Sequence, residues 1–283
     1  MNHRQELAND PYKDFRQAVD RAETKIDLGK AALTIAASDY PNLDIDAYLS
    51  RIDALAISAA ARLGSDADVY RSIAAINFVL FQVHGFRGNR EHYFDPRNSF
   101  LNEVLDRRTG IPISLSVLYI EVAQRVGLSL RGVGFPGHFL VKYVGDHEEI
   151  VVDPFNQGEI LSQKSLETML YRLYGGKIAF DPDLLEPISK KQILKRMLNN
   201  LKIIYLRQND LIKGLSIVDR LMVLDPASGE DIRDRGLIYL QLECFTQALE
   251  DLESYLRLAP HAEDVHAIRK QVTALTRQVA QIH

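Results

Sequence analysis

The segment 112–126 most constrains the fold, because it predicts a helix with almost no polar face. Pro112 suits its first turn, where the N–H that proline lacks would be unpaired anyway. The rest of the segment is largely apolar, and the narrow polar strip that remains consists of Ser114, Glu121 and Arg125. A helix of this kind has to be buried on most of its surface. We therefore expect it at the centre of a folded domain.

Three strand-like runs follow this helix, at residues 129–135, 138–144 and 149–153. The last two frame Gly145-Asp146, and a glycine in the first position predicts a two-residue type II′ turn. Such a turn would place Lys142 opposite Glu149, and His138 opposite Asp153. The sequence thus predicts a small antiparallel sheet in which a histidine and an aspartate on neighbouring strands face each other.

The residues before this segment read mainly as helices, with the clearest ones at 27–39 and from about 44 to 64. After the sheet, the proline-rich run FDPDLLEPIS has the composition of a connector. We therefore expect a first domain at residues 1–185. Its predicted fold class is α+β, with a helical N-terminal half packed on the small antiparallel sheet.

From residue 190 onward the sequence predicts helices only, and a period of 34 residues runs through them. The positions matched at this offset are Tyr205 and Tyr239, Leu206 and Leu240, Gly214 and Ala248, Leu215 and Leu249, Leu224 and Leu258, and Pro226 and Pro260. A helix–turn–helix unit of this length that ends in proline is the signature of a tetratricopeptide repeat. The glycine expected in each repeat is present as Gly236, whereas the first repeat has Lys202 there. The second domain, 190–283, is expected to hold about two repeats and a capping helix at 262–282.

Composition and charge argue against several classes of function. A net charge of −4 and a pI near 6.1 provide no basic surface for nucleic acid. No apolar run is long enough to cross a membrane, and the N-terminus lacks the apolar core of a signal peptide. The single cysteine, Cys244, permits no internal disulfide, and we expect it to be a small core residue. The sequence predicts a soluble, cytoplasmic protein with no cofactor, no nucleic-acid partner and no membrane partner.

A histidine held by an aspartate is the orienting half of a nucleophilic triad. The carboxylate fixes the tautomer of the imidazole ring and stabilises its charged form. The third member is a thiol or a hydroxyl, and the start of a helix suits it because the helix dipole favours an anion there. Ser114 lies in the first turn of the predicted central helix. His138, Asp153 and Ser114 are therefore the candidate catalytic residues.

Several runs of this sequence resemble a known family. The runs are FRGNREHYFDPRNS, NEVLDRRTGIPISLSVLYIE, GVGFPGHFLVK and VDPFNQG. They are similar to a bacterial family that joins a transglutaminase-like (papain-like) core to C-terminal tetratricopeptide repeats, and whose members have been named as regulators of invasion genes. The resemblance implies a core in which a cysteine starts a central helix, a histidine starts a strand, and an aspartate ends the next strand.

His138 and Asp153 match this pattern, but Pro112 occupies the position that the family gives to cysteine. The resemblance therefore implies a pseudoenzyme, a non-catalytic or weakly catalytic regulatory adaptor. It would bind protein partners through residues 190–283 and through a degenerate cleft. The alternative is an amide-bond hydrolase or acyl transferase in which Ser114 is the nucleophile, His138 the base and Asp153 the orienting residue. If Ser114 only caps its helix, the His–Asp pair is a hydrogen bond retained beneath a binding groove.

Two further clusters leave alternatives open. His84, His92 and Asp95 either form a metal site, which no helical spacing supports, or are ordinary loop and helix-end residues. Five arginines gather around the loop before the central helix: Arg87, Arg90, Arg97, Arg107 and Arg108. They either form salt bridges with Asp95, Glu103 and Asp106, or line a pocket for an anion.

Overall fold

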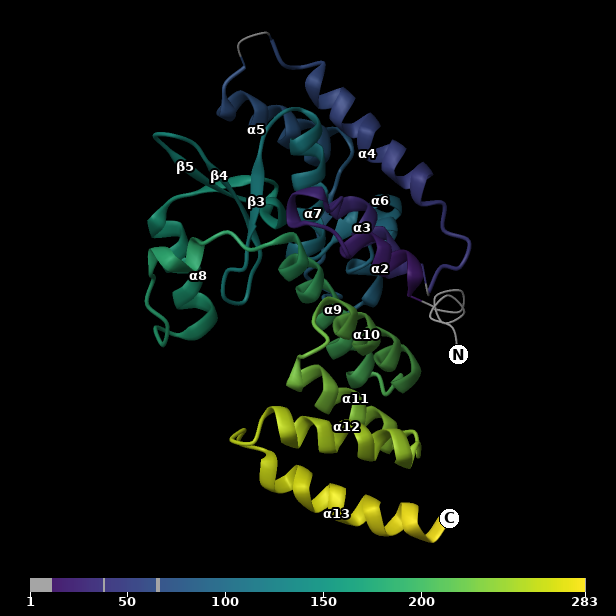
Figure 1. Cartoon of the computed structure of the whole chain (residues 1–283). Helices are drawn as coiled ribbons and strands as arrows, with labels where there is room; N and C mark the ends of the chain where they lie inside the picture. The colour runs from purple at the N-terminus through teal and green to yellow at the C-terminus, as the bar shows by residue number, and fades with distance from the viewer. Residues whose placement is uncertain (1–11, 38, 65–66, 283) are drawn as a thin grey trace. The chain divides into compact units, whose positions relative to one another are not determined.

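The computed structural model describes residues 12–37, 39–64 and 67–282 (Figure 1). Two compact units are present, one formed by Lys13–Met197 and the other by the chain from Leu198 onward with Tyr12. The change of unit falls inside helix α9 (Lys190–Arg207), later in the chain than the connector that the sequence suggests. Residues 1–11, the start of the expected first domain, lie outside the described residues. Within the described residues, no helix is both long and apolar enough to cross a bilayer.

Helices make up most of the first unit. They are α2 (Lys13–Val19), α3 (Leu28–Ala36), α4 (Ile45–Ala60), α5 (Val69–Asn77), α6 (Leu101–Arg107), α7 (Pro112–Arg125) and α8 (Gln163–Tyr174). A π-helical turn, η2 (Phe78–Val83), extends α5, and single 3₁₀ turns occur at η1 (Glu23–Lys25), η3 (Pro96–Asn98), η4 (Pro154–Asn156) and η5 (Pro182–Leu185). The side chains of Asp27, Asp44 and Asp68 cap α3, α4 and α5 by accepting from the backbone N–H three residues on.

Helix α7 is the central helix of this unit, as the sequence predicts. Every residue from Pro112 to Ala123 is buried, and α3, α4, α5, α6 and one face of the sheet pack around the helix (Figure 1). The expected polar strip does not face water, because Ser114 and Glu121 are buried and only Arg125 is partly exposed. Glu121 Oε2 lies 2.6 Å from Arg125 Nη1, and its carboxylate also accepts from the backbone N–H of Gly29 in α3. The polar residues of α7 therefore bond to neighbouring elements.

Replacing Glu121 with glutamine is expected to change how stability depends on pH. Burial raises the pKa of Glu121, and the guanidinium of Arg125 offsets this only in part. A carboxyl group whose pKa is higher in the folded chain than in the unfolded chain stabilises the fold most when it is protonated. Its contribution to the stability of the fold is therefore lost as pH rises through the pKa of the folded chain. Glutamine does not titrate. The stability of Glu121→Gln relative to wild type should therefore increase as pH rises above the ordinary pKa of glutamate, about 4, measured by urea unfolding. An identical pH dependence in both proteins would contradict this expectation.

A four-stranded antiparallel sheet follows α7. Its strands, in spatial order, are β3 (Leu130–Val133), β4 (Leu140–Val144), β5 (Glu149–Asp153) and β6 (Glu159–Leu161), of which the sequence does not predict the last. One face packs towards α7, and the other packs Val133, Leu140 and Val151 against α8 (Figure 1). A short parallel pair, β1 (Arg87–Gly88) and β2 (Thr109–Gly110), joins two loops near the start of α7. The sheet is thus a layer between helices.

The hairpin of β4 and β5 differs from the predicted one. Val144 pairs with Glu149, so residues 145–148 form a four-residue loop and the two-residue turn does not occur. Lys142 consequently lies opposite Val151, two residues from its predicted partner. A shift of two residues leaves each side chain on its original face, and Lys142 Nζ still reaches Glu149 Oε2 along the diagonal at 2.9 Å. The predicted register is wrong, whereas the faces that it assigns are the observed ones.

Among the described residues, the second unit contains the C-terminal part of α9 and four complete helices. These helices are α10 (Leu211–Leu224), α11 (Gly229–Gln241), α12 (Phe245–Leu258) and α13 (Val265–Ile282). The sequence period is also a structural one. Asn209 and Glu243, 34 residues apart, both have a positive φ, of 58° and 59°. The backbone N–H after each of them donates to the carbonyl of Tyr205 or Tyr239 at 2.9 Å. Two helix pairs with the same turn, followed by a final helix, confirm the predicted repeat architecture.

Lys202 and Gly236, which correspond in the two repeats, fill their positions differently. A Cβ at Gly236 would meet Leu252 at 2.9 Å, so the close approach of α11 and α12 requires glycine. Lys202 is buried instead, and its Nζ pairs with Asp231 at 3.1 Å and Asp234 at 2.7 Å. At this position the first repeat therefore has an ion pair between α9 and α11, whereas the second has the backbone of Gly236 packed against the side chain of Leu252.

Cys244 does not lie in the core, where the sequence analysis places it. It is the N-cap residue of α12 and is partly exposed. Its Sγ lies 3.7 Å from the carbonyl oxygen of Leu242, in the turn before the helix. A residue at the end of a helix has neighbours on fewer sides than one in its interior, which explains the exposure.

Candidate functional site

His138 stands at the end of a tight turn, two residues before β4 begins. Its backbone N–H donates to the carbonyl of Phe135 at 3.0 Å, and Gly137 has a φ of +66°. Proline followed by glycine at the central positions fits a type II turn, which requires a positive φ at its third residue. The run Phe135-Pro136-Gly137 therefore fixes the backbone that carries the histidine.

Asp153 is fully buried at the end of β5, and both oxygens of its carboxylate are hydrogen-bonded. Oδ1 accepts from the backbone N–H of Phe155 at 3.0 Å and of Asn156 at 3.3 Å, so Asp153 caps the turn η4. Oδ2 accepts from Asn156 Nδ2 at 2.6 Å and lies 2.9 Å from His138 Nε2. His138 and Asp153 are diagonal neighbours across the two chain segments, as Lys142 and Glu149 are. Diagonal neighbours remain within reach of each other, so the His–Asp contact forms although the register is shifted by two residues.

An arginine near the end of the first unit holds this turn in place. Arg196 Nη2 donates to the carbonyl oxygens of Phe135 at 3.1 Å and His138 at 2.6 Å. Its guanidinium also lies over the ring of Phe139, 5.4 Å from the centroid. Burial lowers the pKa of Arg196. Both of these hydrogen bonds go to backbone carbonyls of the turn, so Arg196 fixes the position of the histidine.

His138 lines a surface cavity of about 790 Å³ in the first unit. The other lining residues come from the turn before His138, from the loop after β1, from the start of α7, and from η4, β6 and α8. The side chain of His138 is 11% exposed and that of Asp153 is 0% exposed, so only the histidine of the pair reaches the cavity. Because Nε2 faces the carboxylate, Nδ1 is the ring nitrogen available to a group in the cavity.

The start of α7 brings no nucleophile to this cavity. Pro112 lines the cavity together with His138. Ser114 is fully buried, its Oγ donates to the carbonyl of Asn98 at 2.6 Å, and it accepts from the N–H of Ile111 at 3.1 Å. This is the arrangement of a helix cap. The nucleophile role considered for Ser114 does not fit it, because the hydroxyl is bonded inside the core.

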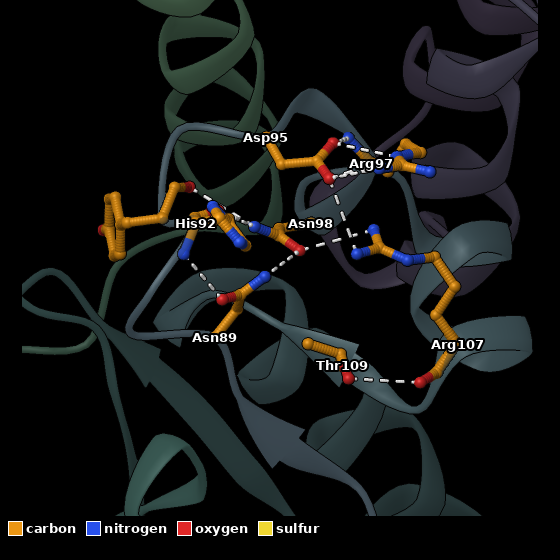
Figure 2. Close-up of polar contacts among 8 residues, drawn as sticks. Asn89, His92, Asp95, Arg97, Asn98, Arg107 and Thr109 are labelled. Carbon is orange, nitrogen blue, oxygen red and sulfur yellow. Dashed lines mark hydrogen bonds and ion pairs between the residues drawn. The ribbon is translucent and has the colours of Figure 1, made fainter.

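The loop between β1 and α6 contacts the start of α7 through the backbone carbonyl of Asn98, whose buried side chain bonds within the loop (Figure 2). Asn98 Nδ2 donates to the carbonyl of His92 at 2.7 Å, and the hydroxyl of Ser114 binds the carbonyl of Asn98 itself. Figure 2 shows Asn89, His92 and Asn98 next to one another in this loop. Arg90 and Tyr93, which line the cavity, belong to this loop. The network therefore gives both residues a defined backbone position.

The arginines near the loop divide into two groups. Asp95 Oδ2 pairs with Arg97 Nη2 at 2.7 Å and Arg107 Nη2 at 3.5 Å (Figure 2). Burial raises the pKa of Asp95, but hydrogen bonds from Arg97 outweigh this and the pKa is lowered. The salt-bridge interpretation thus holds for Arg97 and Arg107. Arg90 has no carboxylate partner among the described residues and faces the cavity instead.

The metal site considered for His84, His92 and Asp95 is not assembled. Among the residues that the structure describes, no three His, Cys, Asp or Glu side chains are grouped so that they could hold a metal ion. Asp95 is bonded to arginines, and the backbone of His92 bonds to the side chains of Asn89 and Asn98. His92 and Asp95 therefore act in the structure of the loop.

Comparison with known proteins assigns both units. Residues 46–199 match the family model of the transglutaminase-like superfamily, and residues 201–273 match that of the tetratricopeptide repeat. The first match spans more than half of the chain. The chain belongs to the transglutaminase-like superfamily.

Relatives match this chain along most of its length, across both the transglutaminase-like region and the repeats. A UPF0162 protein of Xylella fastidiosa (strain 9a5c) is 40% identical, and the match covers 90% of this chain and 92% of that protein. A UPF0162 protein of Vibrio cholerae is 32% identical, with 89% and 93% covered. Protein SirB1 of Salmonella typhimurium is 28% identical, with 87% and 90% covered. The resemblance stated from the sequence runs is thus confirmed, and this combination of domains fits a regulatory or adaptor role.

Asn156 and Arg196 help to position the histidine of this transglutaminase-like domain, and neither is predicted from the sequence. Asn156 lies in the run VDPFNQG, where Asp-Pro signals a capped turn, so its closeness to Asp153 has a local signal. Arg196 has none, because it lies 58 residues from His138 in the sequence and only the fold brings them together.

Proposed function

We propose that this protein is a non-catalytic regulatory adaptor. The repeats within residues 190–283 bind a segment of one protein, and the cavity beside His138 binds a segment of another. The observation that carries this proposal is the position of Pro112, which lines the same cavity as His138. An acyl-transfer enzyme needs a thiol or hydroxyl within reach of the histidine base, and proline supplies neither.

In this proposal the His–Asp pair is a structural element of the cavity wall. Asp153 holds the η4 turn through two backbone N–H groups and holds His138 through Oδ2. The same carboxylate therefore fixes two parts of the wall at once. The alternative of an amide-bond hydrolase or acyl transferase built on Ser114 lacks this kind of support, because the serine hydroxyl caps α7.

An exposed apolar face on α9 supports protein binding by the repeats. Ile203 and Leu206 are 45% and 37% exposed, and they lie three positions apart. Residues at this spacing share one face of a helix. Grouped exposed apolar side chains are typical of sites where proteins interact.

The test of the non-catalytic part is an amide-turnover assay on the full-length chain. The substrates are a glutamine-containing peptide with a fluorescent primary amine, and a peptide anilide. We expect no product above the rate in buffer, and the same result for His138→Ala. Turnover by wild type that Ser114→Ala or His138→Ala removes would contradict the proposal and favour the enzyme.

The adaptor part is tested with a photo-crosslinking amino acid in place of Ile203, in cells that express the full-length chain. We expect one partner protein, identified by mass spectrometry, which then binds the purified chain. Ile57 in α4 is 70% exposed and is the matched control position. The same adducts at both positions, or none at Ile203, would count against binding by the repeats.

A further inference from the structure

Helix α8 forms one wall of the cavity. Two parallel stripes of side chains on this helix, which differ in charge and polarity, line the cavity. Lys164, Thr168 and Arg172 line the cavity at successive intervals of four residues, and so do Ser165, Met169 and Leu173. Residues four apart lie above one another on a helix. The cavity therefore meets two cationic side chains that are separated by two helical turns, with a neighbouring stripe that ends in two apolar side chains.

Arg90 supplies a third cation from the loop after β1. Its Nη2 bonds to Asn156 Oδ1, and its guanidinium lies over the ring of Phe155, 5.0 Å from the centroid. Asn156 is bonded in turn to Asp153, so Arg90 is oriented by the network that holds His138. An arginine fixed through one N–H group keeps other donors for a ligand.

These cations are not neutralised by the chain itself. Among the described residues, none of Arg90, Lys164 and Arg172 forms an ion pair, whereas Arg97 and Arg107 share Asp95. Glu159 is the only carboxylate among the described residues that line the cavity. The chain as a whole has a net charge of −4. The excess of positive charge is therefore local to the cavity, where it attracts negative groups.

We propose that the cavity binds a peptide segment in which acidic and apolar residues are interspersed. The carboxylates of the segment pair with Lys164, Arg172 and Arg90, and its apolar side chains pack on Met169 and Leu173. This inference rests on the proposed function, since it names the partner chemistry of the same cavity. It is independent of the repeats.

The apolar rim favours a peptide over a small anion. Tyr93 and Leu173 both line the cavity and are 38% and 50% exposed. A small polyanion would leave these side chains in water and would fill little of about 790 Å³. A peptide with apolar residues covers them, and burial of such surface is the main source of affinity in peptide grooves.

The test is binding of a fluorescein-labelled octapeptide of alternating leucine and glutamate to the full-length chain, followed by fluorescence anisotropy. We expect binding that weakens as salt is raised, because the contacts are between exposed charges. Lys164→Glu with Arg172→Glu should weaken binding by about tenfold, since two attractions become repulsions. Lys164→Glu alone should also weaken binding of the peptide. The substitution is compatible with the helix, because it places an acidic side chain in the first turn of α8, where the helix dipole favours negative charge.

Arg71→Glu is the matched control. Arg71 is exposed in the first turn of α5 and does not line the cavity, so this variant should bind the peptide like wild type. Equal binding of a leucine–lysine or leucine–serine peptide would overturn the acidic preference and leave the proposed binding cavity standing. Displacement of the peptide by citrate or inorganic phosphate at constant ionic strength would assign the site to small anions and overturn the inference. Failure of every peptide to bind would remove both this inference and the cavity's part in the proposed function.

Discussion

Replacing Asp153 with alanine is expected to lower the free energy of unfolding by about 4 kcal/mol. The side chain is fully buried and accepts hydrogen bonds from two backbone N–H groups and from Asn156 Nδ2, while Oδ2 also contacts His138. Alanine leaves all of these donors without their acceptor in a site that water reaches poorly. Each unsatisfied buried donor costs about 1–3 kcal/mol, so the loss is large even if the η4 turn relaxes.

The comparison with His138→Ala separates the two members of the pair. That variant leaves Asp153 with three of its donors, and it removes a side chain that is 11% exposed, so we expect a loss of only about 1 kcal/mol. Urea unfolding of the full-length chain, followed by tyrosine fluorescence, gives both values. Losses of the same size would mean that the histidine contact dominates. A loss below about 1 kcal/mol for Asp153→Ala would mean that the turn does not depend on its cap.

Placing a thiol at the start of α7 is expected to restore the reactivity that the family pattern implies. The variant is Pro112→Cys in a Cys244→Ser background, because Cys244 is partly exposed and would also react. A thiol at a helix N-terminus beside a histidine has its pKa lowered from about 8.5 to about 7.5 or below. The pH midpoint of alkylation by iodoacetamide should therefore fall by about one unit or more below that of an ordinary thiol.

The control for this prediction is the same variant with His138→Ala. The helix dipole remains in it and the imidazole is lost, so the midpoint should return most of the way towards about 8.5. A midpoint near that of a free thiol, unchanged by His138→Ala, would show that the start of α7 is not directed at the histidine. It would also weaken the argument that Pro112 occupies the place of a nucleophile.

The cavity of this transglutaminase-like domain has a histidine that is held in place from several sides. The turn at Gly137 carries the histidine, Arg196 clamps that turn, and Asp153 holds the ring. In the proposed function, the start of α7 supplies no nucleophile to this cavity, because Pro112 lines it and the hydroxyl of Ser114 is bonded inside the core. What the cavity presents in its place is a set of cations and apolar side chains, and these suit binding.

Much of the fold could be predicted because its signals are local. The apolar segment at 112–126 predicts a buried helix, and α7 is one. The 34-residue period predicts paired helices, and the matching turns at Asn209 and Glu243 repeat it in three dimensions. The hairpin register could not be predicted, because Gly145-Asp146 suits a two-residue turn as well as part of a four-residue loop.

The side-chain roles needed the tertiary structure. Ser114 lies in the first turn of α7 as expected, but rotation around the helix axis decides whether its hydroxyl meets the cavity or Asn98, and it meets Asn98. Arg196 reaches the turn that carries His138, and the basic stripe on α8 reaches the cavity, only through packing of segments that are far apart in the sequence. No spacing rule connects such residues.

The sequence by itself, through its resemblance to the family, predicted that Pro112 holds the position of the nucleophile, and its strand pattern placed His138 and Asp153 on the same side of the hairpin. The first is a matter of residue identity. The second follows from the two-residue period of strands, which a register shift of two residues preserves. The tertiary structure alone decided which polar groups are buried, which face the cavity, and where positive charge gathers. These depend on long-range packing, which brings α8, η4 and the loop after β1 around one histidine.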